Sequence, residues 1–148
     1  MHRLIKIRII RDLEHLEERM HAWRERLFPL GQVALPFRPA ADLYETTEGL
    51  VIRLEIPGAV LEDLSIDLAG QNLIIRGQRR PFPPANVNRV LHYEITYGSF
   101  ERSFHIPIAI NPEGVKARYE NGVLEVKLPR HHPRPRRIPV RDLHEINE

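Results

Sequence analysis

The chain has 148 residues, of which 42% are hydrophobic and 28% are charged. Its 22 lysines and arginines nearly balance 20 aspartates and glutamates, so the net charge of +2 gives little long-range attraction to nucleic-acid phosphates. Cysteine is absent, which excludes a disulfide framework, thiolate catalysis and cysteine-ligated zinc, and fits the reducing cytoplasm. Charges interrupt the first apolar stretch every two or three residues and no stretch is long enough to span a membrane, so we expect neither a signal peptide nor a transmembrane segment.

An amphipathic helix is predicted near the N-terminus. Apolar residues recur there at alternating spacings of four and three, at Ile9, Leu13, Leu16, Met20, Trp23 and Leu27. Such a narrow stripe is typical of a helix that pairs with another helix or captures a foreign apolar surface, and packing on its own domain is the equal alternative. Pro29, Pro36 and Pro39 then predict an irregular linker, so residues 1–40 are expected to form an N-terminal arm.

Short alternating segments separated by turn signals follow the arm. The predicted strands are Leu43–Glu45, Leu50–Ile56, Leu64–Leu68, Leu73–Arg76 and Phe100–Ile106. Pro57 and Gly58 suit the second and third positions of a type II turn. Closely spaced strands of this kind predict an all-β, immunoglobulin-like antiparallel sandwich over residues 41–129.

A β-hairpin is predicted around Asn121–Gly122, because this dipeptide suits the positive φ angles of a type I′ turn. The two-residue turn fixes the register of the flanking strands. It pairs Tyr119 with Leu124, Ala117 with Val126 and Val115 with Leu128 on one buried face. The opposite face is expected to be solvated and carries Lys116, Arg118, Glu120, Glu125 and Lys127.

Two segments do not fit the spacing of a sandwich. Arg79–Gly98 is long for a connection, and its second half, Val90–Tyr97, is predicted to be a projecting strand whose backbone groups a second subunit could pair. Beyond Pro129, residues 130–148 form a Pro- and Arg-rich extension that is expected to be stiff. Its isolated Ile138-Pro139-Val140 presents two apolar side chains at strand spacing. The extension has no core to bury them, so they need an apolar groove outside it.

Taken in order, these motifs resemble the α-crystallin domain of small heat shock proteins. The family's Ala-x-x-x-Asn-Gly-Val-Leu is matched by Ala117, Asn121, Gly122, Val123 and Leu124. Its Leu-Pro-Gly turn is matched by Ile56-Pro57-Gly58, and its tail motif by Ile138-Pro139-Val140. Its Gly-x-Phe-x-Arg-x-Phe-x-Leu-Pro is matched by Gly98, Phe100, Arg102, Phe104, Ile106 and Pro107. The long Arg79–Gly98 segment is similar to that of the bacterial and plant branch, whose loop strand swaps into the partner's sheet.

The resemblance implies a stress-response chaperone without cofactors, an ATP-independent holdase that forms dimers and then larger homo-oligomers. It implies a dimer interface of Arg102 with Leu91, His92, Tyr93, Glu94 and Ile95 against Leu43 and Tyr44. Arg102, placed on the face opposite Phe104, would form ion pairs across that interface rather than being an ordinary solvated arginine. The tail is expected to bind a groove lined by Leu64, Ile66, Leu68, Val115, Ala117 and Tyr119. The N-terminal stripe would bind clients or drive assembly.

Two other classes of function stay open. A nucleic-acid-binding module is suggested by Arg79-Arg80, Arg134 and Arg136-Arg137, although the aromatic residues fall on apolar strand faces rather than on a basic surface. A purely structural oligomer differs from a chaperone only in binding no clients. Enzyme motifs are absent, and His131-His132 lacks the spacing and carboxylates of a metal site, so neither catalytic residues nor metal ligands are expected.

Overall fold

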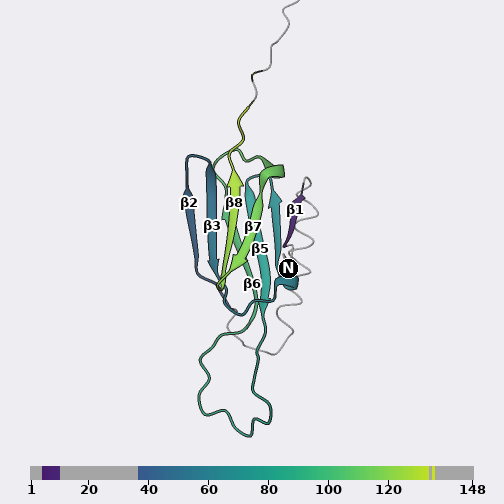
Figure 1. The fold of residues 1–148 in the computed structure, drawn as a ribbon, viewed down its shortest axis with the longest axis vertical. Coiled ribbons are helices and arrows are strands. Elements are labelled where there is room, and N and C mark those ends of the chain that lie inside the picture. Colours follow the sequence, from purple (N-terminus) through teal and green to yellow (C-terminus); the bar gives the residue numbers. More distant parts are fainter. Residues whose placement is uncertain (1–4, 11–36, 134, 136–148) are drawn as a thin grey trace, which may run out of the picture.

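The computed structural model describes residues 5–10, 37–133 and 135, which form two four-stranded sheets packed face to face (Figure 1). Sheet A has the order β1-β4-β5-β6, with strands Lys6–Ile10, Ser65–Ala69, Asn72–Arg79 and Gly98–His105. Sheet B has the order β2-β3-β8-β7, with strands Ala41–Glu45, Gly49–Glu55, Val123–Pro129 and Lys116–Glu120. Two short 3₁₀ turns are η1 (Leu61–Asp63) and η2 (Pro112–Gly114). The predicted all-β antiparallel sandwich is confirmed, with one parallel pair, β1 and β4.

The core lies between the two sheets and is built from the inward side chains of alternating strand positions. These side chains are at most 3% exposed and comprise Leu50, Ile52, Leu54, Ile56, Leu64, Ile66, Leu68, Leu73, Ile75, Phe100, Ile106, Leu124, Val126 and Leu128. Successive side chains of a strand point to opposite faces of its sheet, so each strand contributes every second residue to this layer.

The turns adopt the backbone angles that their residue types favour. Asn121 and Gly122 have φ of 51° and 79°, as a type I′ turn requires, and Ala117 pairs with Val126 as predicted. Gly58 has φ of 76°, and the Ala59 N–H donates to the Ile56 carbonyl at 3.1 Å, which closes the predicted type II turn. The β7–β8 ladder also pairs Tyr119 with Leu124, but it begins at the Lys116–Lys127 pair and so does not include Val115 and Leu128.

The N-terminal prediction is wrong at Ile9. This residue lies in β1, which pairs with β4 and is not part of a helix. The reason is a second periodicity: Ile5, Ile7 and Ile9 alternate with basic residues, and the β-branched isoleucines favour a strand. The other members of the predicted stripe lie outside the described residues: Leu13, Leu16, Met20, Trp23 and Leu27.

The predicted strand Val90–Tyr97 is not formed within one chain. Residues 80–97 have no strand assigned and make a long loop between β5 and β6, which projects from one end of the sandwich (Figure 1). A strand needs a hydrogen-bonded neighbour, and the described part of the chain supplies none to this segment.

We expect Gly77→Ala to destabilise the sandwich. Gly77 faces Phe100 across β5 and β6, and a Cβ atom on it would lie 2.5 Å from Leu64 Cδ2 and 2.6 Å from Phe100 Cζ. Overpacking of this kind costs about 1–3 kcal/mol of unfolding free energy, which urea unfolding measures. Phe100→Leu should relieve part of the clash, so the cost of the double variant should be less than the sum of the single costs. Strict additivity would contradict the steric explanation.

Candidate functional site: sheet edges and exposed apolar surfaces

The β5–β6 loop exposes a concentration of large apolar side chains. Phe82 is 95% exposed and Leu91 is 80% exposed. Further exposed members of this set are Val87, Val90, Tyr93 and Ile95. His92 Nε2 lies 2.8 Å from Glu94 Oε1 on the loop, and both side chains are exposed. Exposed apolar surface on this scale marks an interaction site.

The base of the loop is held by Arg79 at the end of β5. Its Nε donates to the carbonyl of Thr96 at 2.8 Å, and its Nη2 donates to the same oxygen. The guanidinium also lies 3.9 Å from the ring centroid of Phe37 and 5.7 Å from that of Tyr97. The two ends of the loop are therefore fixed to each other while the apolar middle is exposed.

Among the described strands only β3 pairs with β2, which makes β2 an edge strand of sheet B. Its Leu43 and Tyr44 are exposed, at 43% and 46% of their surface. The Tyr44 hydroxyl donates to Asp42 Oδ2 at 2.9 Å, and this hydrogen bond, together with the Asp42 charge, raises the pKa of Tyr44. The free backbone edge of β2 can accept another strand.

Arg102 lies on the same face of β6 as Phe104, contrary to the prediction. Its guanidinium is 5.3 Å from the Phe104 ring centroid, because residues two apart in a strand share a face. The Arg102 Nη1 donates to the Pro39 carbonyl at 2.5 Å, just before β2 begins. Burial and then the nearby Arg38 charge lower the pKa of Arg102. Within the described ranges no carboxylate pairs with Arg102, so its predicted ion pairs across a dimer stay a prediction.

The predicted groove residues lie in both sheets. Leu64, Ile66 and Leu68 are buried at β4, while Ala117 and Tyr119 are half-buried on β7, the outer strand of sheet B. Val115, just before β7, is also buried and completes the predicted set. Strand β1 pairs along β4, so the outer edge of β4 is already covered.

A ladder of charged side chains crosses sheet A from β1 to β6. Arg8 Nε lies 3.0 Å from Asp67 Oδ1, and Arg76 Nη1 lies 2.7 Å from Asp67 Oδ2. Arg76 Nε lies 2.9 Å from Glu101 Oε2. Asp67 and Arg76 are fully buried. Sequence reasoning missed this ladder, since alternating charged residues in a strand usually face water.

Glu125 is also buried, so the prediction that its side chain faces solvent is wrong. Its carboxylate accepts hydrogen bonds from Arg53 Nε at 2.9 Å and Arg118 Nε at 3.0 Å, and Lys127 Nζ lies at 3.8 Å. Burial acts to raise the pKa of Glu125, but the hydrogen bonds and charges of Arg53 and Arg118 outweigh it, and the pKa is lowered. The three cations form the cover of this carboxylate on the outer face of sheet B.

We expect the stability of the sandwich to fall in acid partly through Glu125. A carboxylate whose pKa is lower in the folded state stabilises the fold at pH values above its unfolded-state pKa of about 4.3. This stabilisation is lost as the pH falls through the folded-state pKa. Glu125→Gln should therefore lower the unfolding free energy at neutral pH and flatten its decline below pH ~5. Urea unfolding at a series of pH values measures both effects. An unchanged slope in the variant would show that other carboxylates carry the acid dependence.

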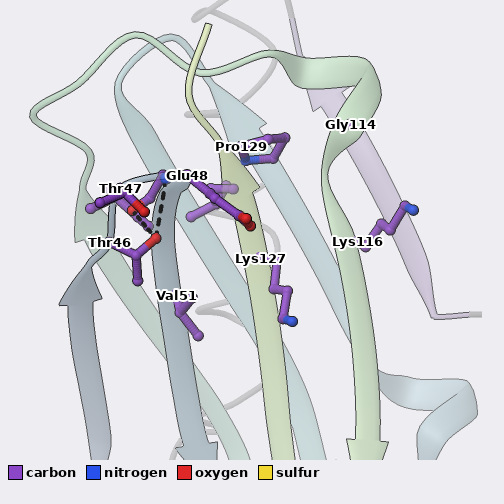
Figure 2. Close-up of a pocket in the computed structure, with 11 residues that line it drawn as sticks. Thr46, Thr47, Glu48, Val51, Gly114, Lys116, Lys127 and Pro129 are labelled. Atoms are coloured by element: carbon purple, nitrogen blue, oxygen red, sulfur yellow. Dashed lines mark hydrogen bonds between the residues drawn. The ribbon is translucent and has the colours of Figure 1, made fainter.

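A pocket of about 350 Å³ opens at one end of sheet B (Figure 2). Its lining includes the Thr46–Gly49 turn, where the Thr46 hydroxyl donates to the Gly49 carbonyl at 3.0 Å, and the directly paired Lys116 and Lys127. The lining offers two threonine hydroxyls, the Glu48 carboxylate and two lysine ammonium groups. In the described part of the chain, no group of three or more His, Cys, Asp or Glu could hold a metal ion, and no helix there could cross a membrane.

Comparison with known proteins identifies similar chains. The model of the Hsp20/alpha crystallin family matches residues 42–141. Spore protein SP21 of Stigmatella aurantiaca is 33% identical over 121 residues, which cover 81% of this chain and 69% of SP21. Small heat shock protein C2 of Rickettsia felis is 34% identical over 92 residues, which cover 62% of this chain and 60% of C2. The solved small heat-shock protein of Xylella fastidiosa superposes with a TM-score of 0.62 at 28% identity, covering 73% of this chain and all of that one.

Proposed function

We propose, since the chain belongs to the Hsp20/alpha crystallin family of non-enzymatic chaperones, that it is an ATP-independent holdase. It binds unfolding proteins through apolar surfaces and prevents their aggregation, and it works in the cytoplasm as an oligomer built from dimers. The observation that carries this proposal is the loop of residues 80–97, which exposes large apolar side chains beside a well-packed core. A chain with such a core has no need of this surface for its own folding.

In this proposal the dimer forms when the loop of one chain reaches β2 of its partner. Val90–Tyr97 would add a strand beside Asp42–Glu45, and Leu91, Tyr93 and Ile95 would cover Leu43 and Tyr44. Three features support the pairing: the open edge of β2, the exposure of both surfaces, and the hydrogen bond from Arg102 to Pro39 that positions the start of β2. Arg102 would lie near the interface and could reach a partner carboxylate.

The remaining proposed contacts involve segments outside the described residues. Ile138, Pro139 and Val140 would bind the groove between β4 and β7 of a neighbouring subunit and join dimers into larger particles. The stripe from Leu13 to Leu27 would bind clients or contribute to assembly. The apolar groove residues of β4 and β7 support the first of these proposals.

The holdase proposal is tested by heating an aggregation-prone model protein with and without this chain, in the absence of nucleotide. We expect light scattering to fall at molar ratios of one to one or below, and added ATP to change nothing. An unrelated folded protein at the same mass concentration is the control. A nucleotide requirement, or unchanged scattering, would refute the proposal and leave a structural oligomer.

Nucleic-acid binding is the weaker alternative. Arg79 is engaged with Thr96 and Phe37, Phe100 is buried, and the Tyr119 hydroxyl donates to the Ile56 carbonyl at 2.9 Å. These groups are therefore not presented for stacking on bases. The alternative predicts tight binding that weakens steeply with salt, so a titration of a labelled oligonucleotide at several salt concentrations separates the two functions.

We expect Ile138→Ala/Val140→Ala to reduce the assembly to dimers. The double substitution removes the apolar contact of the tail, at about 2–5 kcal/mol per large side chain if fully buried and less in an open groove. Native mass spectrometry measures the mass distribution, and circular dichroism should show unchanged β-sheet content. Leu143→Ala, in the same tail, is the matched control and should leave the mass unchanged. A double variant with the parent's mass and subunit-exchange rate would contradict tail docking.

A further inference from the structure

Strand β1 occupies the outer edge of β4 in a parallel register. The register pairs Lys6 with Ser65, Arg8 with Asp67 and Ile10 with Ala69. A strand edge offers one row of backbone donors and acceptors, and a strand already paired there excludes another. The edge that borders the predicted tail groove is therefore covered by a segment of the same chain.

The side chains of β1 contact both the core and the charged ladder. Ile7 of β1 and Ile5, just before this strand, pack against the buried core cluster. On the opposite side of the strand, Arg8 lies 3.0 Å from the buried Asp67. Strand β1 is thus held by two apolar side chains on one face and by one ion pair on the other.

The tail repeats the chemistry of this segment. Residues 5–8 read Ile-Lys-Ile-Arg, and residues 138–141 read Ile-Pro-Val-Arg. Both present two β-branched apolar residues at i and i+2, followed directly by an arginine. If the tail lies in the direction of β1, its two apolar residues meet the positions of Ile5 and Ile7, and Arg141 meets that of Arg8 beside Asp67.

We propose that β1 and the C-terminal tail compete for the same edge of β4, so that β1 masks the tail-docking site of its own subunit until a tail displaces it. This inference rests on the proposed docking of the tail. Strand β1 belongs to the same chain as β4, so its pairing is intramolecular and its effective concentration at this edge exceeds that of a separate molecule at micromolar concentration. A tail supplied by separate dimers at micromolar concentration is outcompeted, whereas tails gathered within one particle are not. Assembly then frees Ile5, Ile7 and Ile9 to contact clients.

The competition is testable with a disulfide that locks β1 in place. The chain has no cysteine, so Lys6→Cys/Ser65→Cys introduces one possible pair, and neighbouring strands lie about 4.8 Å apart, within disulfide range. Arg8 and Asp67 touch two residues further along both strands, and residues two apart share a face, so the Lys6 and Ser65 side chains lie on one face. The background is the full chain with Ile138→Ala/Val140→Ala, so that its own tail does not compete. The probe is a fluorescent peptide of residues 133–143.

We expect the oxidised, locked protein to bind the peptide at least about tenfold more weakly than the same protein after reduction. In the same background without the cysteines, Ile5→Ala/Ile7→Ala should strengthen binding by about tenfold or more, and Lys6→Ala should not. A peptide with Arg141→Ala should bind several-fold more weakly than the unaltered one.

The outcomes separate the two proposals. Equal peptide binding by the locked, reduced and Ile5→Ala/Ile7→Ala proteins would overturn the competition while tail docking stands. Failure of every form to bind would overturn both the competition and tail docking. The holdase activity is measured separately, by light scattering of the parent chain, and its loss would not be confused with either result. Tighter binding only when β1 is released would support the competition.

Discussion

In the Ile138→Ala/Val140→Ala background, replacing residues 80–97 with an Asn-Gly turn is expected to convert the proposed dimer into a folded monomer. Arg79 and Gly98 already pair across β5 and β6, so a two-residue type I′ turn can join them directly without changing the register. The replacement removes the whole segment proposed to cover β2 of the partner. Losing two or more buried side chains, at about 1.5–3 kcal/mol each, raises the dimer dissociation constant by roughly 100-fold or more. Sedimentation measures the mass, and circular dichroism measures the fold.

Point variants separate this strand pairing from a general effect of the loop. Tyr93→Pro keeps the length of the loop but removes a backbone donor and most of a side chain, and it should also weaken the dimer. Val87→Ala lies outside the proposed pairing segment and is the matched control. Dimers that persist at nanomolar concentration after the loop replacement would show that another interface dominates.

The sandwich could be predicted from the sequence because its signals are local. Leu50, Ile52, Leu54 and Ile56 alternate with other residues, and the structure buries all four between the sheets. Asn121 and Gly122 have the positive φ angles that their residue types favour. In these segments, side-chain periodicity and turn chemistry specify the same structure, so no distant contact is needed to decide it.

Strand β1 could not be assigned from the same kind of signal. Ile9 belongs both to a strand-like alternation with Ile5 and Ile7 and to a helical spacing with later residues. The structure assigns Ile9 to the strand through its pairing with Leu68, about 60 positions away, and no local pattern contains that contact. Val90–Tyr97 presents the opposite case, because its pattern favours a strand but the described part of the chain offers it no neighbour.

Buried charge is the second feature that periodicity misses. Asp67 and Glu125 each sit at a position where alternation predicts water, and each is buried with two or more cations. The partners of Asp67 come from β1 and β5, and those of Glu125 come from β3, β7 and its own strand β8. Sheet order and register bring these charged residues together, and neither can be predicted from a short stretch of sequence.

Asp67→Ala is expected to destabilise the sandwich severely. The substitution removes the carboxylate between Arg8 and Arg76 and leaves the buried Arg76 guanidinium with Glu101 as its remaining partner among the contacts of the ladder. Removing one partner of a buried ion pair typically costs about 3–5 kcal/mol. Urea unfolding, followed by circular dichroism at fixed protein concentration, measures this loss.

Two further variants show whether this loss of stability arises because the ion pair is buried. Arg8 is 45% exposed, so Arg8→Ala should cost less than about 1 kcal/mol. Replacing both buried partners, as Asp67→Leu/Arg76→Met, should recover much of the stability, because no buried charge is then left with fewer partners. A cost for Asp67→Ala no larger than that for Arg8→Ala would contradict this account. Asp67 also holds Arg8 of β1, so one carboxylate links the stability of the sandwich to the strand that covers its edge.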